Sequence, residues 1–323
     1  MVFSRTIAAL VLFAAAACPA AAQTYPSRPV HLVVAYAPGG TGDIVARLIS
    51  DKLSAALGQT VVVENRAGAS GAIGTQSVVT AAPDGHMLLV GQTAEISINQ
   101  HWVKGITYNA ERDLQPVALA SVVPLALAVP AKAPYSTMGE FLTALSAPGR
   151  AFSFASAGTG TPGHFAGEFL KLKTRANLTH VPYKGAGPAL NDLLGGHVDL
   201  YFPGFPAVIS HVKSGALKVL AVSSARRSSI APEVPTVAEA ADMKDFDFTL
   251  WQGFFTPRAT PKDIVMRLNT AINAIITQAE TKQKLLEAGA DVIPMSVDQF
   301  AAFAKAESYK YERIIKLTGV TPE

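Results

Sequence analysis

The apolar positions in the first third of the chain group into short runs separated by polar, glycine-bearing turns. The run at 29–36 is almost continuously apolar, as is typical of a strand covered on both faces in a parallel sheet. Further runs of strand type stand at 60–64 and 87–91, on either side of a helical pattern at 72–82. This alternation predicts an α/β class.

A helix is predicted directly after the first strand and its glycine-rich turn at 37–42. Asp43 can cap this helix, because a short carboxylate side chain accepts hydrogen bonds from free amides at a helix start. Three apolar residues then fall at helical spacing along one face: Ile44, Leu48 and Leu57. The first unit therefore reads as strand, turn and helix.

The same pattern starts again in the middle of the chain. A strand at 124–129, a helix at 137–146 and a strand at 151–155 precede a second glycine-rich turn at 156–164. More strands and a helix follow, at 178–183, 188–194, 198–202 and 217–223. Because the chain also exceeds the usual length of one compact domain, two similar α/β lobes are predicted.

The last third combines one strand with long amphipathic helices. The strand is predicted at 248–255, and residues 260–263 match a capping box with Pro261 at the first helical position. Residues 296–299 match a second capping box. The helix that it opens has one apolar side, formed by Phe300, Phe303, Tyr311, Ile314 and Ile315. We expect these helices to pack on the first lobe.

The first 22 residues are interpreted as a secretory signal peptide. One basic residue, Arg5, precedes an apolar run at 7–17 and a stretch of small residues at 19–22. The apolar run is shorter than the roughly 20 residues that cross a bilayer, which disfavours an uncleaved anchor. Cleavage before Cys18, as in lipoproteins, stays open as an alternative.

The amino-acid composition of the chain disfavours some classes of function. Cys18 is the only cysteine, so a mature chain that begins near Gln23 has no disulfide or thiol chemistry. The 27 Lys and Arg residues nearly balance the 24 Asp and Glu residues, and no basic stripe or arm is present. We therefore expect no nucleic acid partner.

Each predicted lobe has one glycine-rich turn between a buried strand and a helix. Such a turn leaves backbone N–H groups free at the positive end of the helix dipole, and hydroxyl groups of neighbouring Thr and Ser residues can add donors. We expect Gly40 and Gly160 to let the loop backbone approach an anion, with positive φ angles. The alternative, that either loop is merely a tight turn, stays open.

Several kinds of catalytic and cofactor site are disfavoured. Residues 158–163 satisfy the dinucleotide pattern, but the acidic residue expected about 20 positions later is missing. The histidines show no zinc-type pairing, and no Gly-x-Ser-x-Gly pentapeptide occurs. We therefore predict no cofactor, no metal site and no catalytic residues.

Three further side chains near the predicted loops and strands have two interpretations each. His164 can donate to a ligand or serve as a local hydrogen-bond partner at a helix start. Trp251 and Phe202 fit core or hinge packing better than stacking on a ligand.

Seven blocks of the sequence resemble, in order, the Bug family of periplasmic binding proteins, the receptors of tripartite tricarboxylate transporters. These blocks lie at 36–47, 64–71, 83–85, 156–164, 180–185, 235–240 and 251–255. They extend over the whole mature chain, which makes the resemblance specific although any single block would be weak.

The resemblance implies a type II periplasmic-binding fold with two α/β lobes, a ligand cleft between them and two crossovers as the hinge. We expect a signal peptide at 1–22, lobe 1 at 23–121 plus 248–323, and lobe 2 at 122–247. The implied function is capture of a small carboxylate in the periplasm for membrane transporter subunits, by a monomer that is not an enzyme. The implied ligand contacts are Gly39, Gly40, Thr41, Asp43, Gly158, Thr159, Gly160, Thr161 and His164, with Asp43 as helix cap and loop organiser.

Glu95 stands where the family varies. Near the cleft it would disfavour a polyanion or select a cationic group, but we expect it to face solvent because charged residues usually do. Two other functions stay open: a secreted α/β hydrolase or lyase that uses His164 with a nearby acid, and a periplasmic sensor that signals to a membrane kinase.

Overall fold

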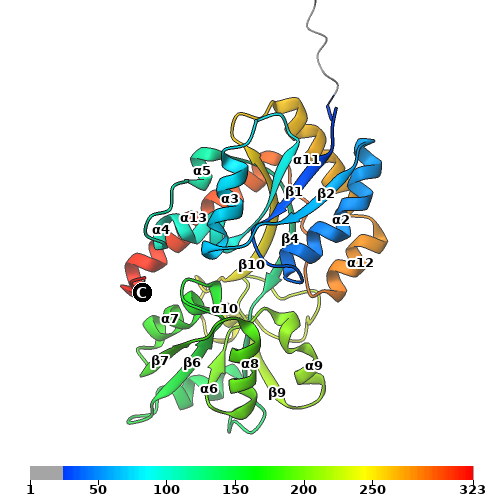
Figure 1. Cartoon of the computed structure of the whole chain (residues 1–323). Coiled ribbons are helices and arrows are strands. Elements are labelled where there is room, and N and C mark those ends of the chain that lie inside the picture. The colour runs from blue at the N-terminus through cyan, green and yellow to red at the C-terminus, as the bar shows by residue number, and fades with distance from the viewer. Residues whose placement is uncertain (1–24, 323) are drawn as a thin grey trace, which may run out of the picture.

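The computed structural model describes residues 25–322 of the chain. The signal peptide predicted at 1–22 lies outside these residues. The described chain forms two lobes, each with one five-stranded sheet between helices, and Figure 1 shows one lobe above the other. The predicted α/β fold with two lobes is confirmed.

The first sheet has the strand order β2-β1-β3-β10-β4. Strand β1 pairs in parallel with β2 and β3, whereas β10 is antiparallel to both β3 and β4. Its strands are β1 (Val30–Val34), β2 (Val61–Asn65), β3 (Met87–Gln92), β4 (Leu114–Pro124) and β10 (Thr249–Pro257). Strand β10 therefore completes this sheet from a segment more than a hundred residues further along the chain.

The second sheet repeats the pattern with the order β7-β6-β8-β5-β9. Strand β6 pairs in parallel with β7 and β8, and β5 is antiparallel to β8 and β9. Its strands are β5 (Ala126–Pro130), β6 (Phe152–Ser156), β7 (Leu178–Pro182), β8 (Leu200–Tyr201) and β9 (Leu217–Val222). Both glycine-rich loops follow the carboxyl end of the central parallel strand, β1 or β6, where ligands bind in open α/β sheets.

Helices cover the two sheets. Around the first sheet lie α2 (Thr41–Leu57), α3 (Ala72–Val79), the π-helical turn η2 (Ala94–Ile98), α4 (Asn99–Trp102), α5 (Ala110–Asp113), α11 (Lys262–Ile276), α12 (Ala279–Glu287) and α13 (Val297–Thr318). Around the second lie α6 (Met138–Leu145), α7 (Pro162–Thr174), α8 (Ala186–Gly195), α9 (Ile209–Lys213) and α10 (Val237–Ala240). Short 3-10 turns at η1 (Ala69–Gly71) and η3 (Phe205–Val208) complete the elements. No helix within residues 25–322 is both long and apolar enough to span a bilayer.

The buried face of α2 differs from the predicted one. The helix buries Val45, Ile49 and Leu53 against the sheet, whereas Ile44 is exposed. Of the expected stripe, only Ile44 is contradicted, because Leu57 is buried and Leu48 packs against the same core. Apolar side chains three and four positions apart occur on more than one face of this helix, so the spacing alone does not show which face is buried. Contact with β1 decides which face is buried.

The predicted capping boxes have different outcomes. Ser296 accepts a hydrogen bond from the amide of Gln299, and the Gln299 side chain accepts from the Ser296 amide, so this box is confirmed. The box at 260–263 is wrong, because Pro261 is the cap position and the Thr260 hydroxyl donates to the carbonyl of Pro257 instead.

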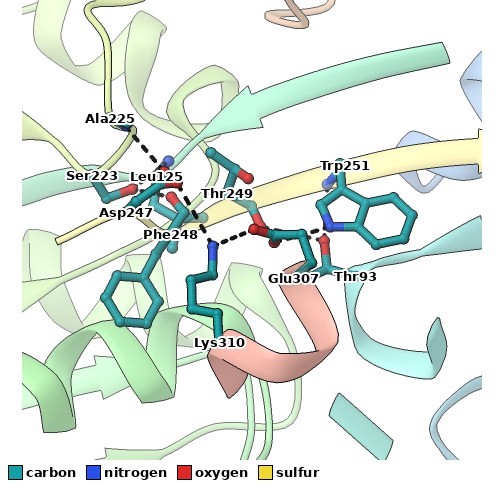
Figure 2. A network of polar contacts seen from close by, with 10 residues as sticks. All are labelled: Thr93, Leu125, Ser223, Ala225, Asp247, Phe248, Thr249, Trp251, Glu307 and Lys310. Carbon is teal, nitrogen blue, oxygen red and sulfur yellow. Dashed lines mark hydrogen bonds and ion pairs between the residues drawn. The ribbon is translucent and has the colours of Figure 1, made fainter. Parts of the chain in front are cut away.

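The chain crosses between the sheets twice. The first crossing joins β4 to β5 at Pro124 and Leu125, and the second runs through residues 223–248 from β9 to β10. Ser223 links the crossings, because its Oγ accepts from the Leu125 amide at 3.0 Å and donates to the Phe248 carbonyl (Figure 2). The lobe limits given above at 121/122 and 247/248 remain a proposal; β4 itself continues to Pro124.

Helix α13 packs on β4 and η2 of the first lobe, and it also reaches the second lobe. Tyr311 lies against Phe165 of α7 and Phe248 of the second crossing, with ring centroids 5.7 Å and 6.2 Å apart. In Figure 2, Lys310 and Glu307 of this helix contact Asp247 and Trp251 respectively. The C-terminal helix therefore braces the region where the chain crosses between lobes.

Candidate ligand-binding site between the lobes

Two cavities that share wall residues lie between the lobes. The larger, of about 360 Å³, is lined on the first lobe by Tyr36, Ser70, Ala94, Asn99, Trp102, Val103 and Lys104, on the second by Thr159, Gly160 and Thr161, and by Pro322. The smaller, of about 220 Å³, shares Tyr36, Ala94 and Thr161 and extends to Gln92, Tyr201 and Phe202. Together they form the cleft that the two-lobe interpretation predicts.

The second glycine-rich loop, at 156–161, is held by its own side chains. The Thr161 hydroxyl donates to the Gly158 carbonyl at 2.8 Å and accepts from the His164 amide at 3.4 Å, which caps α7. The Gly158 amide donates to Ser156 Oγ at 3.2 Å. Within residues 25–322 the amides of Thr159 and Thr161 and the Thr159 hydroxyl have no hydrogen-bond partner. These groups lie at the wall of the larger cavity.

His164 belongs to the interior of this loop. It is buried, and its Nδ1 accepts a hydrogen bond from the Gly160 amide at 3.2 Å. Its ring stacks on His180 with centroids 4.1 Å apart. Burial lowers the pKa of His164 to about 3 and that of His180 to about 4, so both rings are neutral near pH 7. Of the two interpretations of His164, its contacts match the local hydrogen-bond partner.

The first glycine-rich loop, at 37–40, is organised by Asp43. The helix cap is Gly40, so the prediction that Asp43 caps α2 is wrong. Asp43 lies in the first turn, and its carboxylate accepts from the Gly39 amide, Arg47 Nε and Asn65 Nδ2, each at 3.0 Å. The hydrogen bond from Arg47 lowers the pKa of Asp43 to about 2. The carboxylate therefore ties the loop to β2.

The two glycines expected to need positive φ angles differ. Gly160 has φ of +75°, whereas Gly40 has φ of −75°, and a Cβ atom added to Gly40 would approach only the Ala37 carbonyl, at 3.8 Å. The expectation is wrong for Gly40, because the left-handed turn of this loop is made by Gly39, at φ of +88°. Glycine is required by conformation at Gly39 and Gly160.

Three of the nine predicted contacts line the larger cavity: Thr159, Gly160 and Thr161. The other six line neither cavity. Gly158 and His164 make hydrogen bonds within the second loop, and Gly39, Gly40, Thr41 and Asp43 belong to the first loop and the first turn of α2. Their link to the cleft runs through Gly42, which packs against the side chain of Gln92 in the smaller cavity.

Sequence reasoning missed most of the first-lobe wall. Tyr36 lines both cavities, and its place at the carboxyl end of a buried strand was the available signal. Asn99, Trp102 and Lys104 carry no comparable signal, because they follow an irregular π-helical turn. Lys104 is the only charged residue among the described residues that line the two cavities.

Glu95 is fully buried, so the expectation that it faces solvent is wrong. Its carboxyl group accepts from the Gln92 amide at 2.7 Å and from the Tyr36 hydroxyl at 2.8 Å. Burial raises the pKa of Glu95 to about 8. The acid therefore lies behind the cleft wall rather than on it.

Trp251 is buried and lines neither cavity, in agreement with core or hinge packing, whereas Phe202 is buried in the core and also lines the smaller cavity. Trp251 Nε1 donates to Glu307 of α13 at 3.2 Å, so its polar edge has a protein partner (Figure 2). No group of three or more His, Cys, Asp or Glu side chains in the described part of the chain could hold a metal ion.

Two α/β lobes, two crossings and a cleft lined by loops from both lobes define a solute-binding protein. Residues 45–320 match the tripartite tricarboxylate transporter family receptor, and the chain belongs to this family. Receptors of this family are periplasmic solute-binding proteins that work with transporter subunits.

Relatives agree over nearly the whole length. Protein BugT of Bordetella pertussis is 34% identical over 323 residues, covering 99% of each chain. A solved structure of Rpa4515 from R. palustris with adipate has a TM-score of 0.81 at 32% identity, and covers 93% of this chain and 100% of that one. The structure of MatC from Rhodopseudomonas palustris with bound malate has a TM-score of 0.75 at 31% identity, and covers 90% of this chain and 100% of that one.

Proposed function

We propose that the cleft captures a small carboxylate in the periplasm and presents it to the membrane subunits of a tripartite tricarboxylate-type transporter. The observation that carries this proposal is the set of open donors on the second loop, Thr159 and Thr161, which face Lys104 of the first lobe across one cavity. Backbone amides, a hydroxyl and one cation form a suitable environment for a carboxylate. The structures of relatives with adipate and malate support the same ligand class.

The nine predicted site residues divide into two roles in this proposal. Thr159, Gly160 and Thr161 contact the solute, and the amides at the start of α2, from Gly40 and Thr41, approach it when the lobes close. The loops are shaped by the others: Gly39, Asp43, Gly158 and His164. The support is their hydrogen bonding, since the Gly39, Gly158 and Gly160 amides are already taken by side chains of their own loop.

Closure is expected at the two crossings, with residues 122–247 moving as lobe 2 against 23–121 and 248–323. Each lobe supplies only part of the donor set, so neither part alone can remove the solute from water. We further propose that the mature protein begins near Gln23 after cleavage of the signal peptide, and that it acts as a monomer.

The cleft binds without catalysis in this proposal. A hydrolase that uses His164 needs its imidazole free to take a proton, but Nδ1 accepts from Gly160 and burial lowers the pKa of this histidine to about 3. A periplasmic sensor would bind the same class of ligand. This alternative differs from the proposed function only in the membrane protein to which the receptor binds.

The test begins with protein secreted to its native periplasm. Mass spectrometry of the small molecules released on denaturation identifies the bound solute, and calorimetric titration of the refolded protein measures its affinity. We expect a carboxylate bound at one site per chain and recovered unchanged. Steady consumption of the solute that stops on His164→Ala would support the hydrolase, and a carboxylate panel that never binds would contradict the proposal.

A further inference from the structure

A buried acid lies directly behind the wall of the ligand cavity. Glu95 belongs to η2, immediately after β3, and its chain neighbour Ala94 lines both cavities. The Glu95 side chain is fully buried, with one oxygen accepting from the Gln92 amide and the other from the Tyr36 hydroxyl. Tyr36 itself lines both cavities, so it connects the acid to the ligand space.

Among the described residues, the groups that face Glu95 include no cation. Tyr36 contacts it from the end of β1, and Tyr108, which precedes α5, donates to its backbone carbonyl at 2.8 Å. No ion pair joins Glu95 to any residue within 25–322. A carboxylate buried without a cation is costly, so burial raises the pKa of Glu95 to about 8. Burial also raises the pKa of Tyr36 and Tyr108, which stay neutral.

The protonation state of Glu95 decides what Tyr36 can offer to the cavity. An ionised Glu95 only accepts, so the single Tyr36 hydroxyl hydrogen is committed to it and the phenol oxygen presents lone pairs. A protonated Glu95 can donate its own hydrogen to the Tyr36 oxygen, which frees the Tyr36 hydrogen. Among residues 25–322 the Tyr36 hydroxyl has one other acceptor, the Ser70 carbonyl at 3.3 Å, and a ligand carboxylate is the stronger acceptor.

We propose that Glu95 is a positioning residue of the ligand site, which, when protonated, turns Tyr36 into a hydrogen-bond donor to the bound carboxylate. The inference rests on the proposed function of the cleft and goes beyond it, since it makes capture of the anion a proton-linked event. The anion favours the protonated pair for two reasons: it gains a donor, and it avoids a second negative charge behind the wall.

Thermodynamic linkage gives the expected sign. If the solute binds the protonated pair better, binding takes up a proton, and affinity falls as pH rises through the pKa of Glu95. The fall approaches about tenfold for each pH unit above that pKa when one proton is taken up. A simple carboxyl group of the solute is already ionised throughout this range.

The experiment uses the mature chain, with adipate, malate, citrate and acetate as probes. Calorimetric titration from about pH 6.5 to about pH 9.5 gives affinity, and repeats in buffers of different protonation enthalpy give the number of protons taken up. Glu95→Gln keeps a donor toward the Tyr36 oxygen at every pH, so we expect the low-pH affinity with no proton uptake. In Tyr36→Phe we expect weaker binding at low pH and a flattened pH profile. Glu111→Gln, at an exposed acid of the same lobe, is the control and should keep the wild-type profile.

An infrared measurement makes the test independent of any ligand. The C=O stretch of a protonated carboxyl group should be present in the free wild type near pH 7, lost at higher pH and absent from Glu95→Gln. If this C=O stretch is absent from the free wild type near pH 7, the inference is overturned. This outcome needs only the wild type, so it holds even if Glu95→Gln does not fold. Tight binding with no proton uptake overturns the inference and leaves the proposed function standing. Failure of every probe to bind overturns the proposed function itself, and the inference with it.

Discussion

Gly160 of the second lobe lies against the indole of Trp102 in the first lobe. A Cβ atom placed on Gly160 would be 2.7 Å from Trp102 Nε1, closer than side-chain atoms pack. The two residues belong to different lobes and both line the larger cavity, so the space at Gly160 sets how closely the lobes approach. This contact and the positive φ of Gly160 are independent reasons for glycine at this position.

Replacing Gly160 with alanine should therefore weaken solute binding at least tenfold, because the added methyl group meets the Trp102 indole of the other lobe. The control is Gly149→Ala, which has nearly the same φ, +76°, and nothing within 4 Å of the new atom. Both variants should lose about 1 to 2 kcal/mol of stability from the left-handed backbone. Calorimetric titration of both variants with the solute measures the difference in their affinities. If the two variants bind equally well, contact with Trp102 plays no part in closure.

The contact can be tested further with a double-mutant cycle. Trp102→Phe removes the indole edge that Gly160→Ala meets, so the double variant should recover part of the lost affinity. A coupling free energy of about 0.5 kcal/mol or more between the two substitutions is expected for residues in direct contact. Strict additivity would contradict the proposed clash.

Thr159→Ala should cost about 1 kcal/mol of binding free energy, and up to about 3 kcal/mol if its hydroxyl serves a charged oxygen. The reason is that this hydroxyl has no partner among the described residues and lies on the cavity wall. Thr159→Ser keeps the hydroxyl and should bind nearly as well as the wild type. Equal affinity of the alanine and serine variants would show that the hydroxyl faces away from the solute.

Ser223→Ala should destabilise the protein by about 1 to 3 kcal/mol, because Ser223 is fully buried and its hydroxyl serves both crossings between the lobes. Without it, the Leu125 amide loses its acceptor (Figure 2). Urea denaturation measures the change. The neighbouring Ser224→Ala is the control, since this half-buried side chain makes its hydrogen bond to the nearby Arg226 carbonyl and serves neither crossing strand. A stable Ser223→Ala variant with wild-type binding would remove this link from the hinge.

Stability without ligand should fall as pH rises from about 4.5 to about 8 through the contribution of Glu95. The folded protein holds the proton of this buried acid up to a pKa of about 8, whereas the unfolded chain releases it near 4.5, so the folded state binds more protons in that window. The slope from one group is at most about 1.4 kcal/mol per pH unit. Urea denaturation of wild type and Glu95→Gln across this range isolates the effect. Parallel curves would mean that Glu95 is ionised in the folded state.

Local sequence patterns predicted many of the elements and the class of fold, but not strand β4. The strand at 29–36 is observed as Val30–Val34, and the capping box at Ser296 is formed as expected, because both depend on residues within a few positions of each other. The order of family blocks along the chain indicated the type of receptor, and the family match confirms it.

Tertiary structure decided which groups meet in the cleft. The cap of α2 falls on Gly40 because Asp43 is drawn toward Arg47 and Asn65, and Asn65 comes from another strand. Glu95 is buried because the turn that carries it folds behind Tyr36, 59 residues earlier in the chain. Helical periodicity depends on near neighbours and can be read from the sequence, whereas of the predicted caps only the one at Ser296 formed as expected. The meeting of Tyr36, Trp102 and Gly160 around one cavity depends on how two separately formed lobes pack, and no local pattern encodes that arrangement.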